Sequence, residues 1–500
     1  MDLPLPGLAP SRVMAAILAI ILGAIIARLL LPRGGSQLNW YRNGATIIHD
    51  AYRRYPDKLF RLPSTDRRSV VLPLRYLNEI SALPHSVASA SHASSDLSSV
   101  MAIYFFMGRW TTLDAIRTQY ITRLPQQIEA VADELSYALG KSFSNYPDWT
   151  AVAIQPKILS IICRQLDWVA NNIGYAENVF AAAFILKFIP SALRPVFLLC
   201  TPYFYRIHRC RRSIAKTILP HIRQRLEWRD GDPEYWSARV TDGSNSDTKN
   251  PVCLVDWLVK CSQPHESAPA LIARRLTGAS LGATHTTTNH ITNCILDLAA
   301  HFENIAPILR DEIEQVLGPK AEELTLANLD RMWKLDSFMK EVQRFHPASQ
   351  LSVNRKLMKP FTLSTGETLP EGTHISFPGV PISMNERHFE DATTFDPFRF
   401  ERLRRSRSKS GSFSGTDHDQ GGFEYTFTTT YPGTLHFGHG GQTCPGRFMG
   451  SMLSKLLLVK ILLAYDLKLK DGETARPQNI MVGDMDLPNP KSEIVFRNRI

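Results

Sequence analysis

The most informative stretch of the chain is Phe437-Gly438-His439-Gly440-Gly441-Gln442-Thr443-Cys444-Pro445-Gly446-Arg447, which an apolar, helix-like run, Phe448–Ala464, follows directly. Glycines permit tight turns and let a backbone approach a flat ligand closely. A cysteine just before a helix has its thiolate form stabilised by the helix dipole and by free amide groups. A stable metal–sulfur bond requires that thiolate. The stretch therefore predicts that Cys444 can ligate a metal-centred group.

The local sequence leaves other roles for Cys444 open. A lone cysteine is most often a small buried residue of the core. His436, His439 and Cys444 are all zinc-ligand types, so the same stretch could hold zinc. His439 could also serve as the base that activates a nucleophilic Cys444. Residues elsewhere in the chain have to separate these interpretations.

Two upstream segments, Glu341–Arg344 and Phe395–Phe400, carry charges that can pair. Glu341 and Arg344 are three residues apart, so on a helix their side chains share a face. Taken alone, this spacing indicates no more than a common surface ion pair. The second segment, Phe395-Asp396-Pro397-Phe398-Arg399-Phe400, would by itself be an aromatic core segment.

A third segment, Gly282-Ala283-Thr284-His285-Thr286-Thr287, lies between Pro269 and Pro307 with no proline inside those limits. One long helix can therefore run through it, although glycine and threonine are poor helix formers. Such a weak point can open a groove or redirect a backbone hydrogen bond. Alone, the segment is also compatible with a threonine-rich buried helix.

Together, and in this order, the segments resemble the cytochrome P450 family. Phe437, Gly440, Cys444 and Gly446 match its haem-binding loop, which makes Cys444 the expected axial ligand of haem b. The sequence departs from the family at Gln442, where a His or Arg usually faces a haem propionate, although Gln442 can still donate hydrogen bonds. A zinc site or a nucleophile would explain Cys444 but not the other segments.

The resemblance also assigns roles to the upstream segments. It implies that Glu341, Arg344 and Arg399 form a buried network that braces the haem side of the core. It implies that Thr286 helps to deliver protons during oxygen activation. His285 stands where many members have an acid, and a histidine can relay protons near neutral pH. Thr284, His285 and Ser352 are expected to line the substrate pocket.

The resemblance and the patterns imply a mainly α fold with small β-sheets, the cytochrome P450 fold, preceded by a transmembrane helix. The expected domains are a tail at 1–12, an anchor at 13–31 and a catalytic domain at 32–500. Helices are expected at Gln126–Leu139, Leu271–Phe302, Ile308–Leu317 and Leu329–Phe345. Strands are expected at Leu59–Leu62, Ser69–Leu74, Phe361–Leu363 and His374–Phe377. The segment Arg402–Gly422 is expected to be a mobile surface loop, whose basic run is either a solvated face or a docking patch for an acidic partner.

The anchor prediction follows from Val13–Leu31, which is interrupted only by Arg28. As a helix it would be about 28 Å long, close to the thickness of a hydrocarbon core. More basic residues follow its uncharged run than precede it, which predicts a cytosolic catalytic domain. We expect a single-pass protein of the endoplasmic reticulum membrane.

Composition excludes several other classes. The chain has 500 residues, with 57 Lys and Arg against 47 Asp and Glu, a net charge of +10. Its basic residues are scattered and no nucleic-acid motif occurs, so we expect no nucleic-acid partner. The seven cysteines include no CxxC pair, which argues against a disulfide scaffold or a four-cysteine metal site.

The implied activity is insertion of one oxygen atom from dioxygen into a lipophilic small molecule. The electrons would come from NADPH through a membrane-bound NADPH–cytochrome reductase. The segments look most like fungal members, which suggests a secondary metabolite, terpenoid or polyketide-derived. Two alternatives remain: a haem-thiolate isomerase or dehydratase that needs no reductase, and a haem-binding protein with little catalysis.

Overall fold

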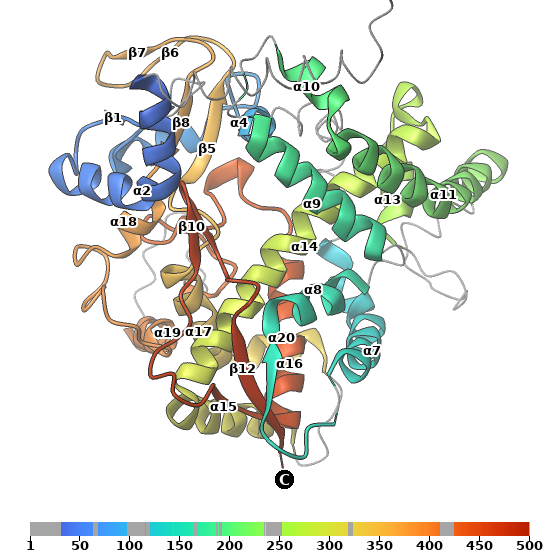
Figure 1. Ribbon diagram of the computed structural model, residues 1–500, viewed down its shortest axis with the longest axis vertical. Helices are drawn as coiled ribbons and strands as arrows, with labels where there is room; N and C mark the ends of the chain where they lie inside the picture. Colours follow the sequence, from blue (N-terminus) through green and yellow to red (C-terminus); the bar gives the residue numbers. More distant parts are fainter. Residues whose placement is uncertain are drawn as a thin grey trace, which may run out of the picture.

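The computed structural model describes residues 32–63, 69–97, 116, 121–143, 145–164, 169–186, 189, 193–234, 236, 253–318, 324–410 and 425–499. Helices make up most of this part, and Figure 1 shows the longest of them, α14 (Pro269–Ala300), crossing the middle of the molecule. The expected mainly helical fold with small sheets is confirmed. The predicted anchor at 13–31 lies outside the described residues. Among the helices that are described, none has the length and hydropathy needed to cross a bilayer.

The remaining α-helices surround α14. They are α2 (Pro32–Arg54), α3 (Leu77–Ser81), α4 (Ala90–Leu97), α7 (Leu124–Ser142), α8 (Ile154–Arg164), α9 (Val169–Leu186), α10 (Arg194–Cys200), α11 (Pro202–Gly231), α13 (Leu254–Cys261), α15 (Phe302–Leu317), α16 (Leu326–Arg331), α17 (Trp333–Phe345), α18 (Gly379–Ser383), α19 (Arg399–Ser410) and α20 (Arg447–Ala464).

The strands form a five-stranded sheet in the order β1-β2-β8-β5-β3, a three-stranded sheet in the order β4-β12-β9, and the pairs β10-β11 and β6-β7. In the largest sheet β2 and β8 run parallel, with Val70 opposite Ile375. The bounds are β1 Phe60–Arg61, β2 Ser69–Val71, β3 Ala88–Ser89, β4 Thr150–Ala153, β5 Ser352–Leu357, β6 Phe361–Thr362, β7 Thr368–Leu369, β8 His374–Phe377, β9 Tyr465–Leu469, β10 Ile480–Val482, β11 Met485–Leu487 and β12 Glu493–Asn498.

The main core lies where the C-terminal half of α14 packs on α20. Ile291, Ile295 and Leu298 of α14 are buried with Leu456 and most other α20 side chains. Burial of α14 on both sides of its glycine and threonines explains why the helix continues through them, although their intrinsic helix propensities are low. A second core joins α9, α11 and α13 to the N-terminal half of α14.

Most predicted elements are found within a few residues of their expected positions. The segment Arg402–Gly422 is an exception, because α19 extends through Ser410 and the predicted loop is therefore wrong for its first part. Arg and Lys are good helix formers. In addition, Arg405 forms an i, i+4 ion pair with Glu401, and Arg404 lies over the Trp333 ring at 3.8 Å. The predicted helix Leu329–Phe345 is likewise divided at Met332.

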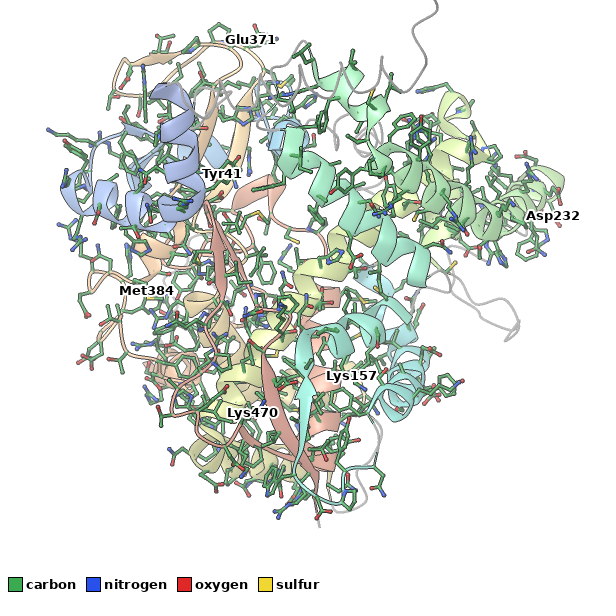
Figure 2. The ribbon with its side chains drawn as sticks, in the orientation of Figure 1. Tyr41, Lys157, Asp232, Glu371, Met384 and Lys470 are labelled. Atoms are coloured by element: carbon green, nitrogen blue, oxygen red, sulfur yellow. The ribbon has the colours of Figure 1, made fainter. Side chains whose placement is uncertain are left out.

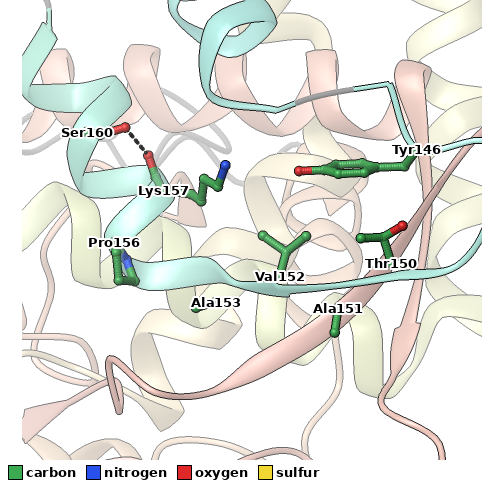
Figure 3. Close-up of a pocket in the computed structure, with 8 residues that line it drawn as sticks. All are labelled: Tyr146, Thr150, Ala151, Val152, Ala153, Pro156, Lys157 and Ser160. Carbon is green, nitrogen blue, oxygen red and sulfur yellow. Dashed lines mark hydrogen bonds between the residues drawn. The ribbon is translucent and has the colours of Figure 1, made fainter.

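A surface hollow of about 390 Å³ lies between β4 and α8, far along the chain from the glycine-rich loop (Figure 3). Its lining residues are Tyr146, Thr150, Ala151, Val152, Ala153, Pro156, Lys157 and Ser160. Lys157 donates to the carbonyl oxygen of Ser142 at 2.5 Å. None of the residues predicted to carry chemistry lines this hollow.

A buried ion pair joins three elements behind the glycine-rich loop. The Lys455 Nζ of α20 lies 2.5 Å from the Asp336 carboxylate of α17 and donates to the Leu329 carbonyl oxygen at 3.1 Å. The second Asp336 oxygen accepts the Phe427 N–H at 2.7 Å. Breaking one side of a buried pair leaves an unneutralised charge in a medium that solvates it poorly.

We therefore expect Lys455→Met to lower the free energy of unfolding by about 3–5 kcal/mol. Lys468→Met is the matched control, since Lys468 pairs with Asp471 at the surface and such pairs contribute about 1 kcal/mol or less. Denaturant unfolding followed by tryptophan fluorescence measures both. Equal unfolding midpoints for the two variants would contradict this role of the buried pair.

Candidate functional site

The glycine-rich loop is closed by its own backbone. The Cys444 N–H donates to the Phe437 carbonyl oxygen at 2.8 Å, and the single 3₁₀ turn Gly440–Gln442 lies between these residues. Gly438 and Gly440 have φ values of +81° and +69°, which residues with side chains rarely adopt. Gly440 also lies so close to Ser81 that an added Cβ would be 2.7 Å from the Ser81 Cβ. The loop thus holds Cys444 directly before α20, where a thiolate is stabilised.

The loop faces a stretch of α14 that is open. Gly282, Ala283 and Thr286 are exposed although Leu281 and Thr284 beside them are buried. An added Cβ at Gly282 would meet no atom within 4 Å. The same is true at Gly441 and Gly446 of the loop and its end. Open space therefore lies along both surfaces.

Contacts farther along α14 show that this open face points at the loop. Residues at i, i+3, i+4 and i+7 share one helix face, and Thr286, Thr287 and His290 follow Ala283 at that spacing. A Cβ at Gly450 of α20 would lie 3.8 Å from the Thr287 hydroxyl oxygen. The His290 ring stacks on Phe427 at 4.8 Å, and Phe427 contacts the Phe437 ring of the loop at 5.3 Å. The cysteine and the threonine thus border one space, which suits a flat group held between them.

The three predicted charged residues come together behind the loop. Arg344 donates to both Glu341 oxygens, from Nη2 at 2.7 Å and from Nε at 2.8 Å, and the Arg399 Nε lies 3.4 Å from Glu341 Oε1. The remaining guanidinium N–H groups bind backbone carbonyls: Arg344 donates to Ser383 at 2.9 Å and Ala392 at 2.5 Å, and Arg399 to Asp391 at 2.9 Å and Thr394 at 3.0 Å. The cluster therefore fastens the irregular segment that precedes α19 to α17.

Thr286 and His285 occupy different sides of α14. The Thr286 hydroxyl is exposed on the open face and donates to the Gly282 carbonyl oxygen at 2.8 Å. The His285 ring packs edge-on against Phe180 of α9 at 5.5 Å, and burial lowers the pKa of His285. His285 is therefore neutral near pH 7.

Two expected pocket residues, Thr284 and Ser352, are buried. Thr284 is buried, donates to the Ser280 carbonyl oxygen at 2.8 Å and contacts Cys163 of α8. It lies two residues before Thr286, which is more than half a helix turn, so the two side chains point to opposite sides of α14. Ser352 is buried against Gly379, where an added Cβ would be 2.2 Å from its hydroxyl oxygen. Both side chains are buried, and their place in a substrate pocket stays a prediction.

Gln442 directs its amide away from the open space. Its Oε1 accepts the Ala90 N–H at 2.8 Å, while Nε2 donates to the Ala88 carbonyl at 2.8 Å and the Leu83 carbonyl at 3.4 Å. The side chain that departs from the family pattern thus joins the loop to the segment that leads into α4.

One cation at the loop was not predicted. Arg355 of β5 is buried and donates to the carbonyl oxygens of Asn354 at 2.9 Å and His439 at 3.4 Å. Burial, reinforced by this charge, lowers the pKa of His439. An arginine within the apolar strand pattern Leu351–Leu357 was the available signal, since buried arginines bind a partner.

The zinc interpretation does not fit the geometry. Among the residues that the structure describes, no group of three His, Cys, Asp or Glu side chains is placed to bind one ion. His436 is enclosed beside Lys340 and Arg344, and burial together with these charges lowers the pKa of His436 to about 3. The His439 Nδ1 lies 3.3 Å from the Thr430 hydroxyl, so the ring of the proposed base is bound there. Cys444 lies between Gly441 and Gly446, where an added Cβ would meet no atom within 4 Å, and this suits a planar metal complex better.

The charged cluster gives a testable expectation. Glu341→Gln keeps the shape of the side chain but removes the charge that neutralises Arg344 and Arg399. We expect the free energy of unfolding to fall by about 3–5 kcal/mol. Glu314→Gln is the control, because Glu314 pairs with Arg499 at the surface. Such a surface pair contributes about 1 kcal/mol or less to the free energy of unfolding. Thermal unfolding by circular dichroism compares the two, and similar melting curves would argue against a bracing role for Glu341.

Comparison with known proteins agrees with this geometry. The family model "Cytochrome P450" matches residues 176–496, which include every segment discussed above from α14 to α20. The cytochrome P450 monooxygenase AN1598 of Emericella nidulans is 30% identical, over 93% of this chain and 85% of that protein. The cytochrome P450 monooxygenase olcJ of Penicillium canescens is 29% identical, over 92% and 85% of the two chains. The ent-kaurene oxidase of Gibberella intermedia is 28% identical, over 93% and 85%. The chain therefore belongs to the cytochrome P450 family, and it is a cytochrome P450 monooxygenase.

Proposed function

We propose that the protein is a membrane-bound haem-thiolate monooxygenase that oxidises a lipophilic secondary metabolite, with Cys444 as the axial ligand. The carrying observation is the placement of Cys444 before α20, opposite the open face of α14 that bears Thr286. Electrons would come from NADPH through a reductase. When bound, a haem with a thiolate ligand supplies the oxygen chemistry.

The residues around the open space fit haem b. Phe437, Gly440 and Gly446 would shape the proximal side, where open space lies beside Gly446. Arg355 supplies a buried positive charge at the edge of the loop, which suits the carboxylate of a propionate. The Gln442 amide is hydrogen-bonded to backbone groups of 83–90. We therefore propose that Gln442 fixes the shape of the loop at the edge of the haem and does not bind a propionate directly.

We assign to Thr286 the holding and passing of a proton. Its hydroxyl donates to the Gly282 carbonyl oxygen and can accept a second hydrogen bond at the same time. By rotation it could instead donate its proton toward the open space. His285 is neutral, so it would take part as a neutral imidazole one residue away, with its ring oriented by Phe180.

Apolar residues support a lipophilic substrate. Phe180 and Phe184 of α9 are 38% and 42% exposed, and Phe184 also contacts the Tyr41 ring of α2 at 5.4 Å. These side chains extend apolar surface from the vicinity of His285 toward the outside. Some relatives are named for the oxidation of ent-kaurene, a terpene hydrocarbon. A terpenoid is therefore the first substrate class to test, and a polyketide-derived compound the second.

The fungal relatives also support a location at the endoplasmic reticulum membrane. We propose that residues 13–31 anchor the chain there as a single span with the catalytic domain in the cytosol. A lipophilic substrate would then reach the active site from the bilayer.

The reduced, carbon-monoxide difference spectrum of the purified full chain tests the ligand. We expect a long-wavelength Soret band that Cys444→Ala abolishes and Cys200→Ala retains, because only a thiolate at the iron shifts the band. Absence of haem, or a band that survives in Cys444→Ala, would refute the haem-thiolate assignment.

The role of Thr286 predicts uncoupling. Thr286→Val removes the hydroxyl while keeping the branched shape, and we expect product formed per NADPH oxidised to fall, with the rate reduced by up to about 10²-fold. Thr286→Ser should recover most of the loss. Thr284→Val, on the other side of α14, is the control.

Product and NADPH consumption are measured together with a reductase and a terpenoid substrate. Unchanged coupling in Thr286→Val would remove Thr286 from the proton path. Turnover without NADPH would point instead to an isomerase or dehydratase. Haem that is never reduced in the presence of reductase would indicate a protein with little catalysis.

A further inference from the structure

The strand β4 (Thr150–Ala153) forms one edge of the three-stranded sheet, whose order is β4-β12-β9. Within the described part of the chain, β12 is the sole strand that pairs with it. Thr150 and Ala151 are exposed. An edge strand presents a row of backbone N–H and C=O groups with which another chain can pair.

The hydrogen bonds of the sheet identify the backbone groups that lie at this edge. The Ile154 N–H, directly after the strand, donates to the Ser492 carbonyl oxygen at 3.3 Å, in register with the pairing of β4 and β12. Residues that bond to the partner strand alternate along an antiparallel pair. Val152 therefore directs its backbone groups to β12, whereas Ala151 and Ala153 direct theirs to the open edge. These two alanines are about 7 Å apart along the strand.

The opposite edge of the same sheet is protected. The strand β9 carries the charged residues Asp466 and Lys468. Arg310 of α15 also donates to the Tyr465 carbonyl oxygen at 2.7 Å and to the Asp466 carboxylate at 2.9 Å. Charged side chains and covering groups of this kind prevent a further strand from adding to an edge. The sequence of β4, Thr-Ala-Val-Ala, contains neither a charge nor a proline.

The hollow between β4 and α8 provides room beside this open edge. All four residues of β4 line it, although successive side chains of a strand point to opposite faces, so the backbone of β4 borders the space. In Figure 3 the Val152 side chain projects toward the space between Lys157 and Tyr146, while Ala151 points the other way. The volume of about 390 Å³ lies within the range of known ligand sites.

One cation lies at this hollow. Figure 2 shows Lys157 where β4 passes into α8, and Figure 3 shows its ammonium group and the Tyr146 hydroxyl directed toward each other across the space. The ammonium group donates to the Ser142 carbonyl oxygen at 2.5 Å and has two further N–H groups. No carboxylate of a described residue pairs with Lys157, and none of the residues that line the hollow is acidic. A carboxylate from outside the chain would complete this arrangement.

We propose that β4 is a docking site for an extended acidic segment of a partner protein. The segment adds to the sheet as a further strand, exchanges backbone hydrogen bonds with Ala151 and Ala153, and places a carboxylate at Lys157. A peptide strand offers N–H and C=O groups at the same spacing as the open edge, whereas a small anion would use the donors alone. The docking site shares no residue with the cysteine loop or the open face of α14, so it concerns an interaction beyond the proposed oxidation.

Peptide binding to the haem-loaded full chain tests the charge. The probe is a short fluorescein-labelled peptide of alternating valine and glutamate, and fluorescence polarisation measures its dissociation constant. We expect Lys157→Gln to weaken binding about tenfold, because a charge-assisted hydrogen bond is lost. Lys141→Gln is the matched control, since Lys141 lies over the Tyr137 ring of α7, outside the hollow. A peptide with glutamine in place of glutamate should bind the unsubstituted chain as weakly as the acidic peptide binds Lys157→Gln.

Ala151→Pro tests the backbone pairing. Proline removes the N–H that faces the open edge, and edge strands tolerate it there, so circular dichroism and the carbon-monoxide spectrum should not change. We expect peptide binding to weaken several-fold, whereas Ala151→Val keeps the N–H and should retain binding. Hydrogen exchange with residue resolution gives a second measurement on the unsubstituted chain. The peptide should slow exchange at Ala151 and Ala153, while Val152 is already protected by β12.

Several results would overturn the proposal. They are the absence of binding at millimolar acidic peptide, equal binding to Lys157→Gln, and exchange at Ala151 that the peptide leaves unchanged. Displacement of the peptide by an equal concentration of acetate would also overturn it, because the hollow would then be a site for small anions. Loss of the carbon-monoxide spectrum in the unsubstituted chain would concern the haem assignment alone.

Discussion

A single backbone hydrogen bond, from the Cys444 N–H to the Phe437 carbonyl oxygen, closes the glycine-rich loop that we propose holds the haem. It is possible only because Gly438 and Gly440 adopt positive φ values and because Gly440 can lie against Ser81. The loop then delivers the sulfur to the start of α20, whose amide groups and dipole favour the thiolate. Both α14 and α20 are held by the same core, so the distance between the sulfur and Thr286 is set by packing.

Buried charges hold the irregular segments around this loop. Glu341 and its two arginines bind the backbone between Ser383 and Thr394. Lys340, one residue earlier on α17, donates to the carbonyl oxygens of Thr426 at 2.7 Å and Thr429 at 2.9 Å. Asp336 of the same helix binds the Phe427 N–H and Lys455. The helix α17 therefore acts as a row of anchors for backbone that has no sheet or helix partner of its own. This arrangement places rigid support directly behind the cysteine loop.

The sequence allowed the candidate site to be predicted more completely than the surface. Cys444, Thr286, Glu341, Arg344 and Arg399 could be selected because their spacing is local or because they lie in recognisable segments. The burial of Thr284 and Ser352 could not be predicted, since helix phase and the close approach of Gly379 are properties of packing. The partners of Arg355 and of the Gln442 amide could not be predicted, because they lie far away along the chain. The basic run of α19 was conspicuous in the sequence, yet Arg402 and Arg405 of that run are paired within the chain.

The sequence by itself determined the cysteine loop, the helical class and the charged residues that brace the core. These features depend on residue type and short spacing, which the chain carries in linear order. Tertiary structure decided which side of α14 is open, which arginines are neutralised and where Gln442 directs its amide. Those outcomes depend on contacts between segments that are far apart in the chain, 84 residues for Arg355 and His439 and 352 for Ala90 and Gln442, so no local pattern records them. Burial, and not propensity, also decided that α14 runs unbroken through its glycine and threonines.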